Sequence, residues 1–191
     1  MHMNSSITWH EILLLESLRT PPAYLKMMSG ISGIEVRSIV EIGVFRGRSS
    51  QQFKALFPEA VLYLIDPWLL YDEYLSQEAG PISKNAPDYE SAYQTVCRLF
   101  ENDPQVKILR KSSLEALTDV PDCIDLVFID GNHDYAHVKQ DIQHWSAKVR
   151  PGGIISGHDY NDLFPGVVQA VDECFPQGVK VGLGDTWFIQ R

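Results

Sequence analysis

The stretch VRSIVEIGVFRGRSS, from Val36 to Ser50, decides the fold class of this 191-residue chain. It opens with an apolar, strand-like run that ends near Val44, and it leads into a segment predicted to be a helix from about Arg48 to Leu56. Glycine between the two permits a tight turn and lets a ligand approach the backbone closely. The start of the helix presents unpaired N–H groups that suit an anionic group. The stretch therefore predicts a strand, a ligand-binding turn and a helix.

The spacing of the glycines narrows what this turn can bind. Gly43 and Gly47 form a G-x-x-x-G pattern, which is neither the G-x-G-x-x-G of dinucleotide sites nor a P-loop with its Gly-Lys-Ser/Thr. An NAD-dependent oxidoreductase is therefore disfavoured. On its own, the pattern is more typical of a strand-to-helix turn that needs glycine only for its geometry.

The rest of the chain alternates between strand-like and helix-like segments. Further strands are expected at Val61–Ile65, Val106–Leu109, Ile124–Ile129, Ile154–Ser156, Val179–Leu183 and Thr186–Ile189. Further helices are expected at residues 7–18, at a short segment ending near Ser29, at Asp88–Glu101 with Asp88 as its cap, at Ser113–Leu117, at Tyr135–Val149 and at Gly166–Cys174. This order predicts an α/β fold, a Rossmann-like, doubly wound, mostly parallel seven-stranded sheet with an antiparallel C-terminal hairpin strand and helices on both faces.

We expect a single domain over residues 1–191, with an N-terminal helical cap at 1–35 and a lid insertion at 67–88. The insertion is irregular and rich in aromatic residues, as is typical of a loop that covers a substrate. A small packed cluster or a dimer contact explains the same composition equally well, so a homo-oligomer stays open.

Composition and charge exclude several classes of partner. The net charge is −9 and no cluster of Lys or Arg offsets it, so the surface repels phosphate backbones and we expect no nucleic-acid partner. No apolar run is long enough to span a bilayer, and we see no signal peptide. The three cysteines are scattered without a C-x-x-C pair, which favours a reducing compartment. We therefore expect a cytoplasmic protein with a small-molecule partner and no membrane contact.

Polar residues follow the second and third expected strands. Asp66 ends the second strand at about the 20-residue offset from the glycine turn at which a carboxylate binds ribose hydroxyls in nucleotide-type sites. It also fits a plain polar strand end before Pro67. Ser112 and Ser113 follow the third strand, where they could reach an adenine edge or cap the next helical turn.

The fourth and fifth strands end in FIDGNHDY, Phe128 to Tyr135, and in SGHDY, Ser156 to Tyr160. Because these strands are expected to be neighbours in a parallel sheet, Asp130, His133 and the pair His158-Asp159 should converge. Carboxylates and imidazole suit a divalent cation, and a histidine there is also a candidate general base. The plainer interpretation is that Asp130 and His133 only fix a turn and bind a cofactor.

With these residues assembled, the chain resembles the class I S-adenosylmethionine-dependent methyltransferases, and most of all a bacterial small-molecule branch with a D-G-x-H-x-Y element. The motifs that carry the resemblance are VEIGVFRGRSS, LYLIDPW, DLVFIDGNHDYAHVKQDI and RPGGIISGHDY, in this order. It covers the chain from about residue 36 to the end. The resemblance implies S-adenosyl-L-methionine as the cofactor and O-methylation of a small-molecule hydroxyl as the reaction.

The resemblance also implies a role for individual positions. The methionine end of the cofactor would be held by Glu41, Gly43, Gly47 and Ser49, its ribose by Asp66 with Trp68 nearby, its adenine by Ser112 and Ser113, and its reactive side by Asp130 and His133. Catalysis would fall to Asp130, His133 and His158, with His133 as the first candidate base and His158 as the second.

At the metal site, the chain departs from the family that it resembles. In metal-dependent O-methyltransferases of this fold, carboxylates at the positions of Asp130 and Asp159 bind Mg²⁺, and an Asn or Asp commonly follows the second. Here that position is Tyr160, so His133, His158 or water would have to complete the shell.

Two other classes of protein share part of this pattern. GNHD, from Gly131 to Asp134, and GHD, from Gly157 to Asp159, resemble elements of calcineurin-like metallophosphoesterases, but the D-x-H and G-D-x-x-D elements that this family needs upstream are not found. A Rossmann-like domain that binds a nucleotide without catalysis is the remaining alternative, because a fold alone does not settle function.

Overall fold

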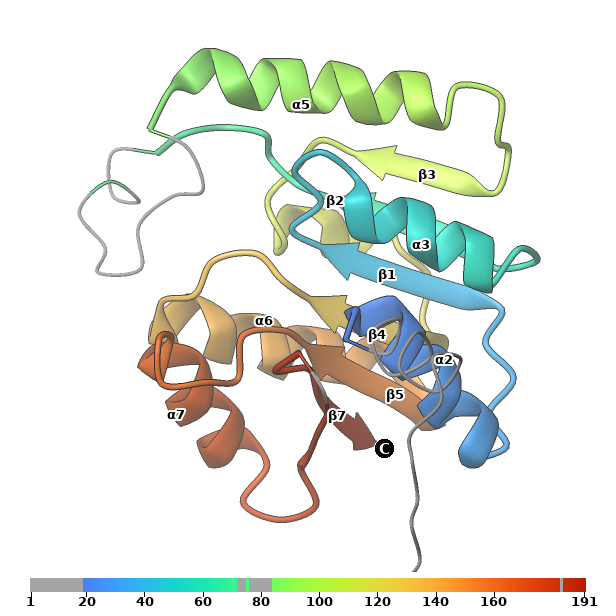
Figure 1. The fold of residues 1–191 in the computed structure, drawn as a ribbon, viewed down its shortest axis with the longest axis vertical. Coiled ribbons are helices and arrows are strands. Elements are labelled where there is room, and N and C mark those ends of the chain that lie inside the picture. Colours follow the sequence, from blue (N-terminus) through green and yellow to red (C-terminus); the bar gives the residue numbers. More distant parts are fainter. Residues whose placement is uncertain (1–18, 72–74, 76–83, 183) are drawn as a thin grey trace, which may run out of the picture.

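A seven-stranded sheet forms the centre of the computed structural model, which describes residues 19–71, 75, 84–182 and 184–191 (Figure 1). Its strands lie in the order β3-β2-β1-β4-β5-β7-β6. Their bounds are β1 Ser38–Ile42, β2 Val61–Ile65, β3 Val106–Leu109, β4 Ile124–Ile129, β5 Val149–Gly157, β6 Lys180–Val181 and β7 Trp187–Gln190. Strands β1 to β5 pair in parallel, whereas β7 runs antiparallel to both β5 and β6. The predicted fold class is confirmed.

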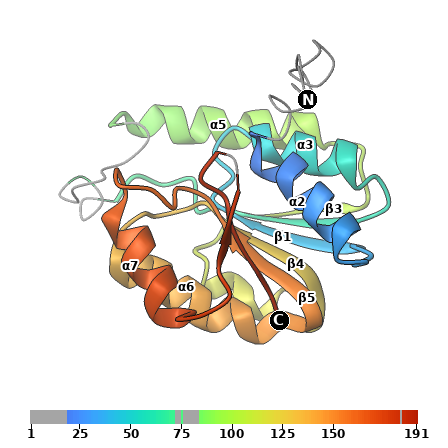
Figure 2. The ribbon, with the colours of Figure 1, turned by 60° about the horizontal axis from the view of Figure 1, so that its bottom comes forward.

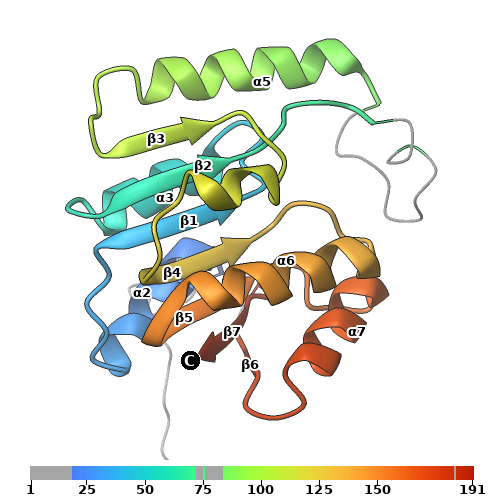
Figure 3. The same ribbon diagram turned by 180° about the vertical axis from the view of Figure 1, so that it is seen from behind.

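Helices cover both faces of the sheet, as Figure 2 shows. Their bounds are α2 Pro21–Ile31, α3 Arg48–Leu56, α5 Ala86–Leu99, the 3-10 turn η1 Glu115–Thr118, α6 Tyr135–Lys148 and α7 Pro165–Cys174. Helices α2, α3 and α5 lie on one face, and α6 and α7 lie on the other, in front of the sheet in Figure 3. Among the described residues, no helix has the length and apolarity needed to cross a membrane.

The central strand β4 shows why the strand segments of the sequence are nearly continuous apolar runs. All six of its residues are buried. Phe128 packs with Phe53 of α3 on one face, and Val127 packs with Ile142 of α6 on the other. A strand between two helical layers needs apolar side chains in both directions, and each large one that is fully buried contributes roughly 1.5–3 kcal/mol.

The predicted start of helix α5 is wrong. The sequence suggested Asp88 as the cap of a helix from 88 to 101, but α5 begins at Ala86 and Asp88 lies in its first turn. Pro87 explains the difference, because proline fits the first turn of a helix, where its missing N–H is not needed. The helix predicted at 7–18 lies outside the described residues, as does half of the predicted lid, residues 72–74 and 76–83.

The sheet order places a ligand site at one point. From β1, the chain proceeds outward through β2 and β3 in one direction and through β4 and β5 in the other. In open α/β sheets, ligands bind beyond the carboxyl ends of the strands at such a reversal. Here that point lies between the ends of β1 and β4, where Gly43 and Asp130 follow their strands.

Candidate active site

The backbones after β1 and β4 touch at Gly43. Gly43 has φ +87°, and a Cβ added to it would lie 2.1 Å from the carbonyl oxygen of Asp130. The hydrogen bonding of the sheet continues on both sides of this contact, because the amide of Gly43 donates to the carbonyl of Ile65 and the amide of Asp130 donates to the carbonyl of Ile42. Glycine is therefore required at position 43 by backbone contact alone, and this contact fixes the glycine turn against the start of the FIDGNHDY loop.

Asp66 holds the same turn from the other side. Its Oδ2 accepts hydrogen bonds from the amides of Val44 and Phe45, at 3.0 and 2.9 Å, and its Oδ1 accepts one from the amide of Trp68 at 2.6 Å. Burial raises the pKa of Asp66, while the bonds from Phe45, Trp68 and Val44 oppose that rise. A carboxylate has about four acceptor positions, so about one is left for a ligand.

Trp68 lies in the core behind the turn. Its side chain is 1% exposed, its indole N–H donates to the carbonyl of Phe45 at 2.7 Å, and its ring lies 5.1 Å from that of Tyr93. Trp68 thus supports the turn from within the core, and its predicted place near the ribose stays a prediction.

Glu41 is a buried carboxyl group at the end of β1. It accepts hydrogen bonds from the hydroxyls of Ser49 and Ser50 in the first turn of α3, the second of them at 2.6 Å. Burial raises the pKa of Glu41 to about 8, despite the opposing effect of the two serine bonds. The group ties β1 to α3, and Gly47 is the left-handed residue, at φ +72°, that lets α3 start there.

The serines after β3 are both engaged within the protein. Ser112 and Glu115 form reciprocal bonds at the start of η1: the amide and hydroxyl of Ser112 donate to the Glu115 carboxylate at 3.0 and 2.7 Å, and the amide of Glu115 donates to the Ser112 hydroxyl at 3.4 Å. The hydroxyl of Ser113 donates to Asp141 and accepts the indole N–H of Trp145, both on α6. The Ser112 hydroxyl is therefore engaged with Glu115, and the Ser113 hydroxyl joins the segment after β3 to α6, while contact of either serine with an adenine stays a prediction.

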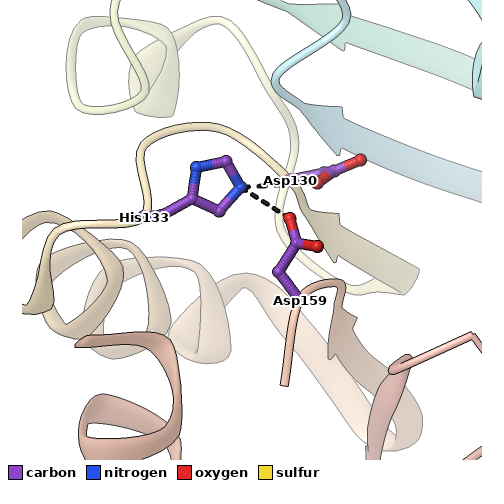
Figure 4. A group of neighbouring side chains, drawn as sticks. All are labelled: Asp130, His133 and Asp159. Atoms are coloured by element: carbon purple, nitrogen blue, oxygen red, sulfur yellow. Dashed lines mark ion pairs between the residues drawn. The ribbon is translucent and has the colours of Figure 1, made fainter. Parts of the chain in front are cut away.

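Three donor groups converge beyond the ends of β4 and β5 (Figure 4). The Nε2 atom of His133 lies 2.7 Å from Oδ2 of Asp159 and 4.0 Å from Oδ1 of Asp130. One donor atom from each residue lies within 4.8 Å of the other two. Nε2 is buried and has no hydrogen-bond partner within the part of the chain that the structure describes. The convergence predicted from the strand ends is thus present.

His158 approaches the same carboxylates with its Nδ1 atom, which lies 3.5 Å from Asp130 and 3.2 Å from Asp159. Burial would lower its pKa, but the bonds to Asp130 and Asp159 outweigh burial and raise the pKa of His158 to about 10. Burial raises the pKa of Asp130. Burial alone would also raise the pKa of Asp159, but the imidazoles of His133 and His158 hold that pKa below its usual range. The two carboxylates therefore favour the protonated form of His158, whose charge opposes the negative charge of this group.

Phe164 is a site residue that the sequence did not reveal. Its ring lies over the ring of His133, with centroids 4.5 Å apart and an angle of 32° between the planes. It precedes α7, and a Cβ on Gly166 in that helix would come within 2.8 Å of the carbonyl of His133. No spacing rule links Phe164 to the FIDGNHDY loop, because the contact arises only from the packing of α7 on α6.

The residues around this group complete its frame. Asp134 accepts a bond from the amide of Ala136 at 3.3 Å and caps α6. Tyr160, which stands where a third metal ligand is common, turns away and donates its hydroxyl to Asp172 at 2.6 Å. His133 is thus the third donor of the group in place of Tyr160.

The comparison with protein families agrees with this geometry. A family model described as a methyltransferase domain matches residues 40–160, which is more than half of the chain and contains the glycine turn, Asp66 and the three donors. The chain belongs to the methyltransferase-domain family. A curated relative, the uncharacterized protein y4gI of Sinorhizobium fredii strain NGR234, is 29% identical over 134 residues. That match covers 68% of this chain and only 14% of the relative.

Solved structures share the fold of this methyltransferase domain. The O-methyltransferase NovP is 20% identical and superposes with a TM-score of 0.64 over 98% of this chain and 83% of its own. CalS11, the TDP-rhamnose 3'-O-methyltransferase of calicheamicin biosynthesis, is 16% identical, with a TM-score of 0.59 over 96% and 81%. An O-methyltransferase from Bacillus cereus in complex with SAH is 15% identical, with a TM-score of 0.57 over 89% and 80%.

Proposed function

We propose that this chain is an S-adenosylmethionine-dependent methyltransferase that methylates a hydroxyl group of a small molecule. One observation carries the proposal: Asp130, His133 and Asp159 converge at the point where the sheet order reverses, beside a glycine turn whose backbone touches Asp130. The O-methyltransferases with the same fold support this reaction class. The alternative of nucleotide binding without catalysis gives no reason for three donors at this edge.

The cofactor would lie over the glycine turn, with the residues of that turn at its methionine end. Gly43 and Gly47 give the turn its shape, and the helix start after Gly47 offers N–H groups to a carboxylate. Glu41 and Ser49 would support the turn without contacting the cofactor directly, because their hydrogen bond joins β1 to α3. Asp66 has about one acceptor position left for a ribose hydroxyl.

Methyl transfer is then a displacement in line at the sulfonium. The acceptor oxygen forms a bond to the methyl carbon while the bond from carbon to sulfur breaks, the sulfonium becomes the thioether of S-adenosylhomocysteine, and the acceptor proton leaves to solvent. Because the methyl group is already activated, the protein contributes mostly positioning in a site with little water.

The three donors fit a divalent cation, which would supply Lewis acidity that lowers the pKa of the acceptor hydroxyl. The fit rests on the buried Nε2 of His133, which faces two carboxylates without a hydrogen-bond partner among the described residues. Since that atom has no exposed surface, it is poorly placed to take a proton from an acceptor directly. We therefore place His133 beside Asp130 and Asp159 as a ligand, which revises its predicted role as the base.

Segments around the edge would select the acceptor. Leu69 and Tyr71, which follow Trp68 in the predicted lid region, are 53% and 40% exposed, and Leu163 after β5 is 81% exposed. Apolar side chains at the same edge of the sheet favour an acceptor with an apolar body next to its hydroxyl. We keep the lid at 67–88, the cap at 1–35 and the single domain as proposals.

Thermal unfolding with added ligands tests the proposed function. A ligand of the native state raises the melting temperature, so S-adenosylhomocysteine should raise it and NAD should not. No shift with S-adenosylhomocysteine, together with turnover of a phosphate ester in the presence of Mn²⁺, would replace the proposal with a hydrolase. A shift with NAD alone would point to an oxidoreductase.

A further inference from the structure

We infer that His133 is a nitrogen ligand that makes this site prefer a transition-metal dication, such as Co²⁺ or Zn²⁺, over Mg²⁺. The inference rests on the proposed function, because that function supplies a reason for a cation at this place. It goes further by naming the class of cation and the residue that selects it.

The orientation of the His133 ring is the first support. Nε2 lies 2.7 Å from Oδ2 of Asp159 in an ion pair whose direction does not fit a hydrogen bond, and Nε2 has no hydrogen-bond partner in the described part of the chain. A buried imidazole nitrogen usually has a hydrogen-bond partner. An atom that faces two carboxylates without one is placed as a cation ligand would be placed.

Packing keeps the ring in that orientation. Phe164 lies over one face of the imidazole, and Gly166 of α7 brings its backbone against the carbonyl of His133. The other donors come from separate segments, Asp130 from the end of β4 and Asp159 from the end of β5. Asp130 and His133 share the loop after β4 while Asp159 follows β5, so the group is assembled from two separate segments and is not a chance cluster on one loop.

The chemistry of the donor set gives the preference. Mg²⁺ takes oxygen ligands and keeps much of its water, whereas imidazole suits transition metals such as Fe²⁺, Ni²⁺ and Zn²⁺, and Co²⁺ lies between Fe²⁺ and Ni²⁺ in the order of affinity. The oxygen ligand that could stand at position 160 is absent, since Tyr160 donates to Asp172. His158 does not belong to the group of three, and its Nδ1 contacts the carboxylates at 3.2–3.5 Å. Two carboxylates and one imidazole thus remain as a mixed oxygen and nitrogen set.

Metal binding by the whole, chelator-treated chain tests the inference without an activity assay. Calorimetric titration should give Co²⁺ an affinity at least about tenfold higher than that of Mg²⁺, in line with the ligand preferences of the two ions. Pulsed electron paramagnetic resonance on the Mn²⁺-loaded protein should show coupling to an imidazole nitrogen. The variant His133→Ala should lose that coupling and most of the difference between Co²⁺ and Mg²⁺.

His137→Ala is the matched control. It removes an imidazole near the start of α6 that lies 3.5 Å from Asp134 and is half exposed, so it should keep both the coupling and the preference. A second variant, Phe164→Leu, keeps an apolar side chain but removes the ring and should weaken Co²⁺ binding more than Mg²⁺ binding.

Two results would overturn the inference: equal affinity of the parent chain for Co²⁺ and Mg²⁺, or a nitrogen coupling that survives in His133→Ala. The shift produced by S-adenosylhomocysteine is measured on the same proteins. If the parent chain shows this shift but no metal preference, only the inference fails. If the parent chain shows no shift, the proposed function fails as well.

Discussion

Gly43 and Asp130 are in backbone contact, with no room for even a methyl group between them. A Cβ on Gly43 would stand 2.1 Å from the carbonyl oxygen of Asp130 and 2.6 Å from the α-carbon of Gly131. The turn after β1, which would hold the cofactor, and the loop after β4, which carries two of the three donors, are therefore one unit. A change on either side should affect both.

Gly43→Ala should lower the free energy of unfolding by about 2 kcal/mol or more, because the added methyl group meets rigid backbone and the residue has a positive φ. It should also weaken S-adenosylhomocysteine binding. The matched control is Gly30→Ala in α2, where an added Cβ meets nothing within 4 Å. That control should be neutral or more stable by up to ~1 kcal/mol. Urea unfolding measures both, and equal effects would disprove the contact.

Glu41 should make the stability of the protein fall as the pH rises. Its pKa is about 8 in the folded chain, against 4.5 as the ordinary value, so the folded state holds more protons between these two values. The free energy of unfolding then decreases with pH across this window, by an amount on the order of a few kcal/mol. Urea unfolding of the parent chain at pH 5, 6.5 and 8 measures this slope.

The variant Glu41→Gln should flatten that slope and should be more stable than the parent at pH 8, since an amide stays neutral there. Glu59→Gln, which changes an exposed side chain two residues before β2, is the control and should leave the slope unchanged. A slope that persists in Glu41→Gln would assign the pH dependence to another group.

The fold was predictable because its signal is local. The apolar run of β4 and the alternation of strands with helical segments indicate a covered parallel sheet before any contact is known. The cap of α5 was misplaced by three positions, at Asp88 instead of Asn85, because Asp88 and Pro87 both suit a helix start and only the structure shows that Pro87 lies inside the first turn. The sheet order then explains why Asp130 and Asp159 meet.

The site was predictable as a set of positions but not as a set of bonds. Sequence placed Ser113 at a strand end, where cofactor binding and a structural bond are equally reasonable. The structural partners, Asp141 and Trp145, lie on α6 and become neighbours only when that helix packs on the sheet. Phe164 was missed for the same reason, since its stacking on His133 depends on how α7 meets α6.

Ser113→Ala should destabilise the protein without removing the cofactor. The change leaves the indole N–H of Trp145 and the carboxyl of Asp141 without the Ser113 hydroxyl, and an unsatisfied buried group costs about 1–3 kcal/mol. Ser112→Ala, which removes a hydroxyl whose bond to Glu115 is exposed, should cost about 0.5–1.5 kcal/mol. Calorimetric affinity for S-adenosylhomocysteine should stay within a few-fold of the parent in both. A loss of affinity without a loss of stability in Ser113→Ala would restore the adenine role.

Asp66 separates two explanations of cofactor binding, a direct bond to ribose and support of the turn. If support dominates, Asp66→Ala removes the acceptor of three backbone N–H groups, which should lower stability by at least about 2 kcal/mol and abolish the S-adenosylhomocysteine shift. Asp66→Asn keeps one oxygen for Val44 and Phe45, so it should lose less of both. Stability and affinity should therefore fall together across the two variants. If Asp66→Asn instead keeps the parent's stability and still loses the ligand, the carboxylate acts on the ribose directly and the turn does not depend on it.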